Sequence, residues 1–339
     1  MSLIIPHSRP WITESDRRSV DHVLGSGMIA RGDMVERFEE QTALHANVQG
    51  AVATASGSSA IEIALRALSV GPDMEVILPT YVCGSVLKAV RSVGGTPVLC
   101  DVSPGWVMDR AAVEQHVGPK TAAIIVVHTF GIASDIDGIM SLGCPVIEDA
   151  CQSFGMCLGN RFSGSIGTIG VYSFHATKCL TTGEGGMVIS DSAELISAAR
   201  SLRNGDSAIC ASPMSDLQAS LGIAQLSRYH EFIARRNRIR RHYDKVVGAN
   251  RAPKSDFLFR YPVISTRPFA QVQDWFSKQG IHVRRGVDAL LHSEMELDDD
   301  RFPNACHLWR STISVPFFPG LSCAEVDRVV EVLADANFE

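Results

Sequence analysis

A single lysine, Lys178, lies between an apolar, β-rich run and a turn of small residues in the segment FHATKCLTTGEGGMVIS (174–190). Lysine is rarely buried without a partner, and only six of the 31 basic residues are lysines. A desolvated lysine has a lowered pKa and acts as an amine nucleophile in Schiff-base chemistry. The alternative is a lysine whose ammonium group reaches water while its stem is covered.

A second group of residues is suited to binding phosphate. In ASGSSA (55–60) a β-rich run ends in Ser-Gly-Ser-Ser directly before a helical pattern. Free N–H groups and the positive end of the helix dipole attract anions there, and the hydroxyls of Ser58 and Ser59 can add hydrogen bonds. An ordinary helix N-cap explains the same residues. No nucleotide-binding G-x-x-x-x-G-K-[ST] signature is present.

A third group is a pair of acids at the end of an apolar strand, in PVIEDACQSFG (145–155). Glu148 and Asp149 alternate faces of that strand, so only one of them can point into a site at the end of the sheet. An acid in this place is suited to binding a metal, to acting as a general base or to pairing with a buried cation. A carboxylate that merely caps the loop remains an alternative.

The three groups together match the needs of pyridoxal phosphate. Its phosphate needs an anion site, its pyridine nitrogen needs a carboxylate to stay protonated, and its aldehyde needs a lysine. The order along the chain is a serine-rich helix start, then Asp149, then Lys178. The combination predicts this cofactor, although each group alone is ambiguous.

The elements that position these groups follow a repeating pattern of strand, turn and helix from about residue 50. IEIALRAL, for example, has apolar residues at helical spacing. Alternation of this kind predicts a large α/β domain whose mainly parallel sheet of seven strands is covered by helices on both faces. The predicted strands are GAVATAS, EVILPT, PVLCDV, AAIIVVHTF, PVIEDA, GVYSF and GGMVIS.

The chain changes character after residue 190. One long amphipathic helical stretch (216–247) is followed by short β-like pieces, FLFRYPV and HVRRG, and a final helix, CAEVDRVVEVLADA. The sequence therefore predicts a large domain over residues 1–240 and a smaller C-terminal α+β domain over residues 241–339.

Composition excludes several classes of function. A formal net charge of −6 and a pI near 6.0 argue against a nucleic-acid partner, and the basic cluster Arg235–Arg241 fits a solvated helix face. No apolar run approaches the roughly 20 residues of a membrane span, and no signal peptide is evident. No two of the nine cysteines are separated by only two residues. We therefore expect a cytoplasmic protein with reduced, mostly buried cysteines and no metal site.

Nearly the whole sequence resembles the DegT/StrS family of pyridoxal-phosphate-dependent sugar aminotransferases, which have the fold of aspartate aminotransferase (fold type I). The most specific motifs are EDACQSFG and SFHATK…GEGG, supported by ASGSSAIEIALRAL and VILPTYVCGSV. The resemblance implies that Lys178 forms the internal aldimine and moves the proton. It also implies that Asp149 pairs with the pyridinium and that Gln152 contacts the ring hydroxyl. The implied phosphate ligands are Gly57, Ser58, Ser59 and Ser173.

Some positions depart from the family pattern. Cys83 stands where relatives commonly have an aromatic residue that stacks on the cofactor ring, and Ala211 stands where relatives often have an asparagine that reaches the partner's cofactor. His175, three residues before the lysine, is a candidate supporting residue, with simple packing as the alternative. Arg285 and His292 are candidate substrate contacts, with ordinary surface roles as the alternative.

The resemblance implies a cytoplasmic homodimer whose active sites lie near the subunit interface. It would transfer an amino group from glutamate or glutamine to a keto-sugar, normally nucleotide-linked, or to a related keto-cyclitol, by a ping-pong mechanism. Lys178 stands where the dehydratase branch of the family has histidine, which favours transamination. Two alternatives remain: a pyridoxal-phosphate-dependent lyase or dehydratase, and a non-catalytic regulatory protein of the same fold.

Overall fold

The computed structural model describes residues 4–205, 212–248, 251–336 and 338. At its centre is a seven-stranded sheet with the strand order β1-β9-β8-β5-β4-β2-β3. Only β9 runs antiparallel to its neighbours, and all other pairs are parallel, so the predicted mainly parallel sheet is confirmed. The strands are β1 (Gly50–Thr54), β2 (Glu75–Pro79), β3 (Thr96–Cys100), β4 (Thr121–Val127), β5 (Val146–Asp149), β8 (Ile169–Ser173) and β9 (Gly186–Ser190).

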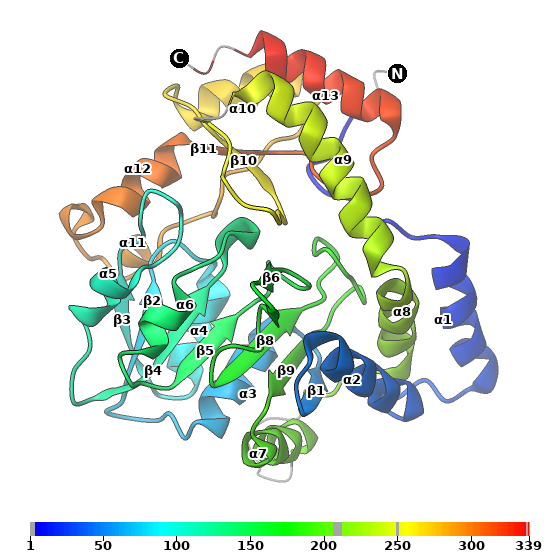
Figure 1. Cartoon of the computed structure of the whole chain (residues 1–339), viewed down its shortest axis with the longest axis vertical. Coiled ribbons are helices and arrows are strands. Elements are labelled where there is room, and N and C mark those ends of the chain that lie inside the picture. Colours follow the sequence, from blue (N-terminus) through cyan, green and yellow to red (C-terminus); the bar gives the residue numbers. More distant parts are fainter. Residues whose placement is uncertain (1–3, 206–211, 249–250, 337, 339) are drawn as a thin grey trace.

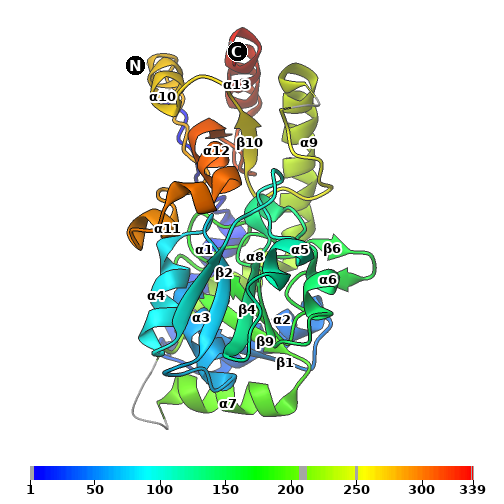
Figure 2. The same ribbon diagram turned by 90° about the vertical axis from the view of Figure 1, so that its left-hand side faces the viewer.

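Helices cover both faces of this sheet (Figures 1 and 2). Helices α3, α4 and α7 pack together on one face, and α2, α5 and α6 lie on the other, with α8 between α1 and α2. The helices are α1 (Glu14–Ser26), α2 (Asp33–Ala46), α3 (Gly57–Ala67), α4 (Gly84–Ser92), α5 (Arg110–Glu114), α6 (Ile136–Met140), α7 (Ala193–Asn204) and α8 (Asp216–Ser227). In the described part of the chain, no helix combines the length and the apolar character that crossing a membrane requires.

The C-terminal third forms a second unit beside the sheet. Helix α9 runs from α8 to this unit, where it packs against α13 (Figure 1). The elements are α9 (Tyr229–Val247), β10 (Tyr261–Ile264), α10 (Phe269–Lys278), α11 (Leu291–Glu294), the 3-10 turn η2 (Asp299–Arg301), α12 (Pro303–Ser311), β11 (Thr312–Val315) and α13 (Cys323–Asp335). Strands β10 and β11 pair antiparallel.

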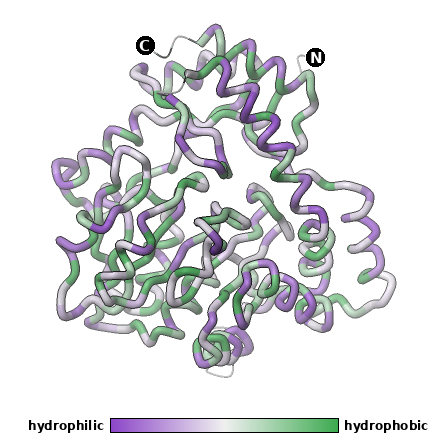
Figure 3. The backbone as a smooth tube through the Cα atoms, in the orientation of Figure 1, coloured by the Kyte–Doolittle hydropathy of each residue, from purple (hydrophilic) through white to green (hydrophobic). Residues whose placement is uncertain are grey.

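Burial explains why the central strands read as continuous apolar runs. Every residue of β5, β8 and β9 is buried, as expected for strands covered by helices on both faces. Hydropathy along the chain shows the same layout: green dominates the sheet, and purple recurs along the outer helices (Figure 3).

The predicted long helix is in fact two helices, α8 and α9. They meet at Arg228, whose backbone leaves the helical conformation (φ −119°, ψ 19°). The guanidinium of Arg228 pairs with the buried carboxylate of Asp16 in α1 and lies over the rings of Trp11 and Phe232. A pattern of local periodicity carries no information about these long-range contacts.

The small-domain prediction was incomplete in detail. The segment HVRRG is not a regular strand and contributes only isolated bridges, such as Arg284 with Ser314, and β11 was not predicted. One hydrophobic cluster joins β10, β11, α9, α10 and α13. Residues between Val287 and Leu308 pack instead on the core of the sheet. The domain boundary at residue 240 stays a prediction.

All eight cysteines that the structure describes are unpaired, as expected. The expectation that most would be buried was wrong, because only Cys100, Cys179 and Cys306 are fully buried.

Candidate active site

The three groups of residues from the sequence meet at one edge of the sheet. Strands β1 and β8 both run antiparallel to β9, and β5 runs parallel to β8, so the carboxyl ends of β1, β5 and β8 point the same way. Thr54 and Ser173 both lie opposite Gly186, and Asp149 lies opposite Val171. The helix start, the acid pair and the lysine loop are therefore neighbours where open α/β sheets bind ligands.

The helix start after β1 packs directly against the end of β8. A Cβ atom added to Gly57 would lie 2.7 Å from Cβ of Ser173 and 3.3 Å from Sγ of Cys151, so only glycine fits there. Ser56 is the N-cap of α3, and its Oγ accepts a hydrogen bond from the N–H of Ser59. The N-terminal N–H groups of Gly57 and Ser58 have no intrahelical acceptor and remain available to an anion.

The structure separates the roles of the two adjacent acids, beginning with Glu148. Glu148 is completely buried, and one oxygen lies 2.8 Å from Nε2 of His128. The other oxygen accepts hydrogen bonds from the N–H groups of Ile166 and Gly167, both at 2.9 Å. Burial alone would raise the pKa of Glu148, but His128 and the backbone donors outweigh it and hold this pKa below its usual value. Glu148 is therefore a structural acid.

Asp149 lies on the opposite face and is 4% exposed. One of its oxygens accepts a hydrogen bond from the N–H of Cys151 at 3.0 Å. The thiol of Cys151 also lies within hydrogen-bonding reach of this carboxylate, but within the described ranges Asp149 has no ion-pair partner. Asp149 is therefore the acid that remains free to pair with a ligand cation.

The thiol of Cys151 lies among the site residues. Burial raises its pKa well above the usual value, the charge of Asp149 raises it further, and the charge of Lys178 opposes both effects. Cys83 adds a smaller contribution in the raising direction. These groups are therefore within electrostatic reach of one thiol. Sequence reasoning did not single out Cys151, although its place two residues after Asp149 was the available signal.

Lys178 lies in the loop between β8 and β9, as predicted. The N–H of Lys178 donates to the carbonyl of His175 at 2.8 Å, and the loop is closed where the N–H of Phe174 donates to the carbonyl of Gly185 at 2.8 Å. The Nζ atom lies 5.1 Å from the ring centroid of Phe259. No hydrogen bond or ion pair to this Nζ atom is found in the described part of the chain, so the amine is available for chemistry.

Backbone contacts connect the lysine's aromatic neighbour to Gln152. The N–H of Phe259 donates to the carbonyl of Phe130 at 2.7 Å, and the N–H of Phe130 donates to Oε1 of Gln152 at 2.9 Å. Phe130 has a left-handed backbone (φ 60°), which is rare for a bulky residue and typical of functional sites. This contact occupies the amide oxygen of Gln152, so its NH₂ group remains to donate. Phe130 and Phe259 were missed because no local pattern connects them.

Two further predicted residues lie beside this edge. Cys83 is exposed, forms the N-cap of α4, and has its Sγ 3.0 Å from Oγ of Ser85. His175 lies in the lysine loop, with Nδ1 2.9 Å from Oγ1 of Thr177 and Nε2 3.6 Å from Glu184. The side chain of His175 is 46% exposed, so it is only partly packed. Ala211 lies outside the described residues.

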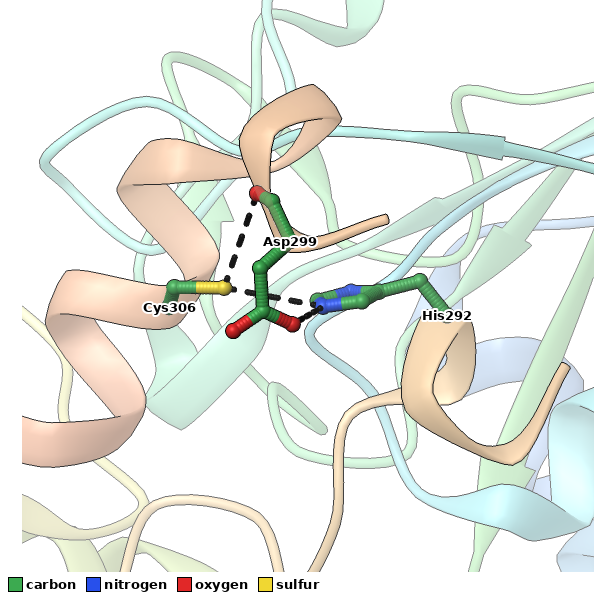
Figure 4. Close-up of side chains that lie close together, drawn as sticks. All are labelled: His292, Asp299 and Cys306. Carbon is green, nitrogen blue, oxygen red and sulfur yellow. Dashed lines mark hydrogen bonds and ion pairs between the residues drawn. The ribbon is translucent and has the colours of Figure 1, made fainter. Parts of the chain in front are cut away.

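Arg285 and His292 have structural contacts away from the lysine loop. Arg285 donates to the carbonyl of Trp309 at 2.8 Å and stacks 3.9 Å from the centroid of its ring. Burial lowers the pKa of Arg285. His292 is completely buried and stacks on Phe302; Figure 4 shows it with its neighbours Asp299 and Cys306. The surface role considered for His292 was therefore wrong, because its imidazole is part of the interior.

A large hollow opens beside the lysine loop. It has a volume of about 810 Å³, and its wall includes His175, Thr177 and Arg284. A narrow crevice next to it is lined by Lys178, Phe259 and other residues, and His7 lines both spaces. The hollow is within the size range of small-molecule sites and is adjacent to the reactive amine.

The sheet, the lysine loop and the acid at one edge define the fold of the type I pyridoxal-phosphate-dependent transferases. The donor set fits that cofactor: a carboxylate with one spare oxygen, an amine without a partner, and a helix start that only glycine allows so close to Ser173.

The chain belongs to the DegT/DnrJ/EryC1/StrS aminotransferase family, whose model matches residues 10–334. It is 28% identical, over 98% of its length and 96% of the relative's, to the spore coat polysaccharide biosynthesis protein SpsC of Bacillus subtilis (strain 168). Among solved structures, the aminotransferase TlmJ from Streptoalloteichus hindustanus matches with a TM-score of 0.92 and 27% identity, covering 98% of each chain. The putative sugar aminotransferase Spr1654 from Streptococcus pneumoniae, PMP-form, matches with a TM-score of 0.91 and 26% identity, covering 98% of this chain and 97% of Spr1654. The protein is thus an aminotransferase, and the family resemblance of the sequence is confirmed.

Proposed function

We propose that this aminotransferase uses pyridoxal phosphate to transfer an amino group from glutamate or glutamine to a keto-sugar linked to a nucleotide, by a ping-pong mechanism. The observation that carries the proposal is the pairing, at one sheet edge, of an amine without a partner, Lys178, with an under-bonded buried carboxylate, Asp149. PMP- and PLP-form structures of Spr1654 support the choice of cofactor.

The residues around the edge have complementary tasks in this proposal. The N–H groups at the start of α3, with Ser58, Ser59 and Ser173, hold the phosphate, and Gly57 lets the helix start come close enough. Asp149 holds the proton on the pyridine nitrogen, which keeps the ring positively charged. Gln152 donates its free NH₂ group to the ring hydroxyl. Cys83 packs on the ring with less area than an aromatic residue offers.

Lys178 is the point of covalent attachment and the base of the reaction. When bound, the cofactor supplies an electron sink that stabilises negative charge developing on the substrate carbon. The Nζ atom of Lys178, once released, accepts the proton from that carbon and returns it on the other side of the transfer. The ring of Phe259 beside Nζ covers the amine without hydrogen bonding to it. His175 holds the loop in place through Thr177.

The large hollow supports a nucleotide-linked acceptor. The residues that line it include His175, His282 and Arg284 but only one acid, Asp274. Arginine is well suited to binding phosphate oxygens. A volume of about 810 Å³ exceeds what a free sugar needs. The solved structure of DesI in the presence of its TDP-sugar product, 25% identical to this chain, is consistent with such an acceptor.

We also propose that the enzyme is a cytoplasmic homodimer with active sites near the subunit interface. Large apolar side chains are exposed at the end of α1 and just after it: Leu24 is 53%, Met28 is 74% and Ile29 is 48% exposed. Clustered exposed apolar residues are typical of interaction surfaces. Light scattering of the purified protein tests this, and a monomer would contradict it.

The proposed function is tested by labelling and by turnover. Borohydride reduction of the purified, cofactor-loaded enzyme should fix the cofactor to the peptide that contains Lys178. A panel of nucleotide-linked keto-sugars is then screened with glutamate and glutamine as donors. Label on another lysine would refute the site. Failure of both donors to convert the cofactor to its amine form would favour a lyase or dehydratase. Full biological activity in Lys178→Ala would favour a regulatory protein.

A further inference from the structure

Three metal-ligating side chains converge away from the lysine loop. His292 from α11, Asp299 from η2 and Cys306 from α12 point toward one another (Figure 4). Nε2 of His292 lies 3.1 Å from Oδ1 of Asp299 and 3.5 Å from Sγ of Cys306. The three ligand atoms lie within 4.8 Å of one another. Neither the family match nor the proposed amino transfer uses these residues.

The spacing of the ligand atoms fits a tetrahedral ion. Zinc binds imidazole nitrogen and carboxylate oxygen at about 2.0–2.1 Å and thiolate sulfur at about 2.3 Å. A tetrahedron with those bond lengths has a nitrogen–oxygen edge of about 3.3 Å and a nitrogen–sulfur edge of about 3.5 Å. The distances of 3.1 Å and 3.5 Å in the structure match both of these edges, and the third pair, the oxygen of Asp299 and the sulfur of Cys306, lies within 4.8 Å.

The imidazole of His292 is already oriented for binding. Its Nδ1 lies 2.7 Å from Oγ1 of Thr80, and its ring stacks on Phe302 with centroids 4.4 Å apart. When Nδ1–H donates to this hydroxyl, Nε2 presents its lone pair to the cluster. Metal-binding histidines usually have such a partner on their other nitrogen. Because His292 is completely buried, its ring cannot turn away.

Asp299 and Cys306 also have the access and charge that a metal requires. Both line a hollow of about 160 Å³, together with Arg310, which is room enough for a water as fourth ligand. Arg310 contacts Oδ2 of Asp299 at 3.2 Å and so leaves Oδ1 for an ion. A carboxylate and a thiolate carry two negative charges, which a divalent cation balances.

We propose that His292, Asp299 and Cys306 bind a zinc ion, with a water molecule in the fourth position. A mixed set of nitrogen, oxygen and sulfur in tetrahedral geometry favours zinc over magnesium or calcium, which prefer oxygen ligands. Binding forms one Zn–S bond and releases the thiol proton to solvent, with no change of oxidation state. The expectation of no metal site considered only closely spaced cysteines, whereas these three ligands, one of each residue type, follow one another at intervals of seven residues.

The ion would lie where the C-terminal segment contacts the large sheet. Thr80, which holds His292, follows β2 and accepts the N–H of His292 at 3.0 Å. Its carbonyl also accepts the N–H of Leu291 at 3.1 Å. Three residues after Thr80 comes Cys83, which lies within electrostatic reach of the Cys151 thiol in the active site. Zinc is therefore expected to stabilise this part of the fold and not to take part in amino transfer.

The test uses the full-length, cofactor-loaded enzyme after dialysis against a chelator. Zn²⁺ is titrated in competition with a chromophoric chelator, and Co²⁺ serves as the spectroscopic probe. We expect one Zn²⁺ per chain, a raised thermal midpoint with Zn²⁺, and Co²⁺ absorption bands typical of tetrahedral coordination with a thiolate-to-cobalt charge-transfer band. Asp299→Asn should lower the affinity for Zn²⁺ at least tenfold, and Cys306→Ser should remove the charge-transfer band.

Two variants serve as controls. Asp300→Asn changes the adjacent exposed acid, and Cys323→Ser changes an exposed cysteine outside the cluster; both should bind Zn²⁺ as the wild type does. Asp299 is 54% exposed, so its substitution keeps the fold intact even if Cys306→Ser does not. Absence of stoichiometric Zn²⁺ binding, or unchanged affinity in Asp299→Asn, overturns the proposal. Either result leaves the amino-transfer proposal unaffected, because that rests on Lys178.

Discussion

Replacing Glu148 and Asp149 separately by their amides distinguishes a contribution to fold stability from a contribution to cofactor binding. In Glu148→Gln the carboxylate loses its charge where it now accepts from His128 at 2.8 Å and from two backbone N–H groups at 2.9 Å. The NH₂ group of the new glutamine is a donor, and it must face either His128 or the two backbone N–H groups, which are donors as well. Weakening the acceptor of three buried donors costs about 1–3 kcal/mol for each donor left unsatisfied, a large share of the roughly 5–15 kcal/mol that holds a protein folded.

Asp149→Asn should behave in the opposite way. The amide oxygen of asparagine can still accept the N–H of Cys151, the one backbone hydrogen bond that the carboxylate accepts among the described residues. We therefore expect the free energy of unfolding of the cofactor-free protein to change by less than about 1 kcal/mol. Loss of the charge that pairs with the pyridinium costs about 2–5 kcal/mol, which corresponds to cofactor affinity weakened about 30-fold or more.

The assay compares urea unfolding of the cofactor-free proteins with a cofactor titration followed by absorbance. We expect a crossed result, in which Glu148→Gln lowers the free energy of unfolding and Asp149→Asn lowers the affinity for the cofactor. Equal loss of stability in both variants would refute it, and so would an unchanged cofactor affinity in Asp149→Asn. Since the pKa of Glu148 is held below its usual value, the stability that Glu148 contributes is present above the usual carboxyl pKa. It is lost as the pH falls through the lowered value, so Glu148→Gln should also flatten the acid side of the stability profile.

Three further outcomes are expected. Burial, and then the charges of two arginines, lower the pKa of His7 from 6.5 to about 3. Between pH 6.5 and about pH 3, His7 therefore gains a proton only in the unfolded chain. The free energy of unfolding, measured with urea, should fall by about 2 kcal/mol from pH 7 to pH 5 through His7, and His7→Gln should lack this contribution. Gly57→Ala pushes the start of α3 away from Ser173 and should weaken the cofactor at least tenfold by titration, while Gly71→Ala, which meets no atom within 4 Å, should not. Arg285→Ala should lower the free energy of unfolding by about 1–2 kcal/mol and leave KM for both substrates within about twofold; a raised KM at unchanged stability would show a substrate contact instead.

The sheet and the lysine loop could be predicted from the sequence because local patterns of residue type indicate both. Apolar runs such as β4 alternate with segments of helical periodicity, and the small residues after Lys178 predict a turn. The choice between Glu148 and Asp149 could not be made locally. It depends on His128, which follows the neighbouring strand β4, and on backbone donors beyond β5.

Contacts between distant segments account for the other misses. Phe259 reaches Lys178 from a segment 81 residues further along the chain, and no spacing rule predicts that contact. The surface role considered for His292 was wrong for the same reason, because this histidine is buried and its hydrogen-bond partner Thr80 lies 212 residues away in sequence. Residue type predicts which chemistry a side chain can do, whereas long-range packing decides whether that side chain is free to do it.

The buried acids show this difference within one molecule. Six Asp or Glu residues are buried in the described part of the chain. Five of them accept at least two hydrogen bonds, as the cost of a buried charge requires. These five are Asp16, Glu39, Glu148, Asp216 and Glu325.

Asp149 is the exception, because it accepts one N–H bond, from Cys151, and otherwise has only the weakly donating thiol of Cys151 within reach. It is also the buried acid at the sheet edge where Lys178 has a ring beside its amine but no hydrogen-bond partner. The other buried carboxylates have their hydrogen-bond partners within the protein. A buried carboxylate with fewer partners indicates that a bound ligand supplies the missing one. The positive ring nitrogen of the proposed cofactor is the group that does so. If Asp149→Asn is stable without cofactor, the fold does not require the negative charge of Asp149, and the charge serves the cofactor instead.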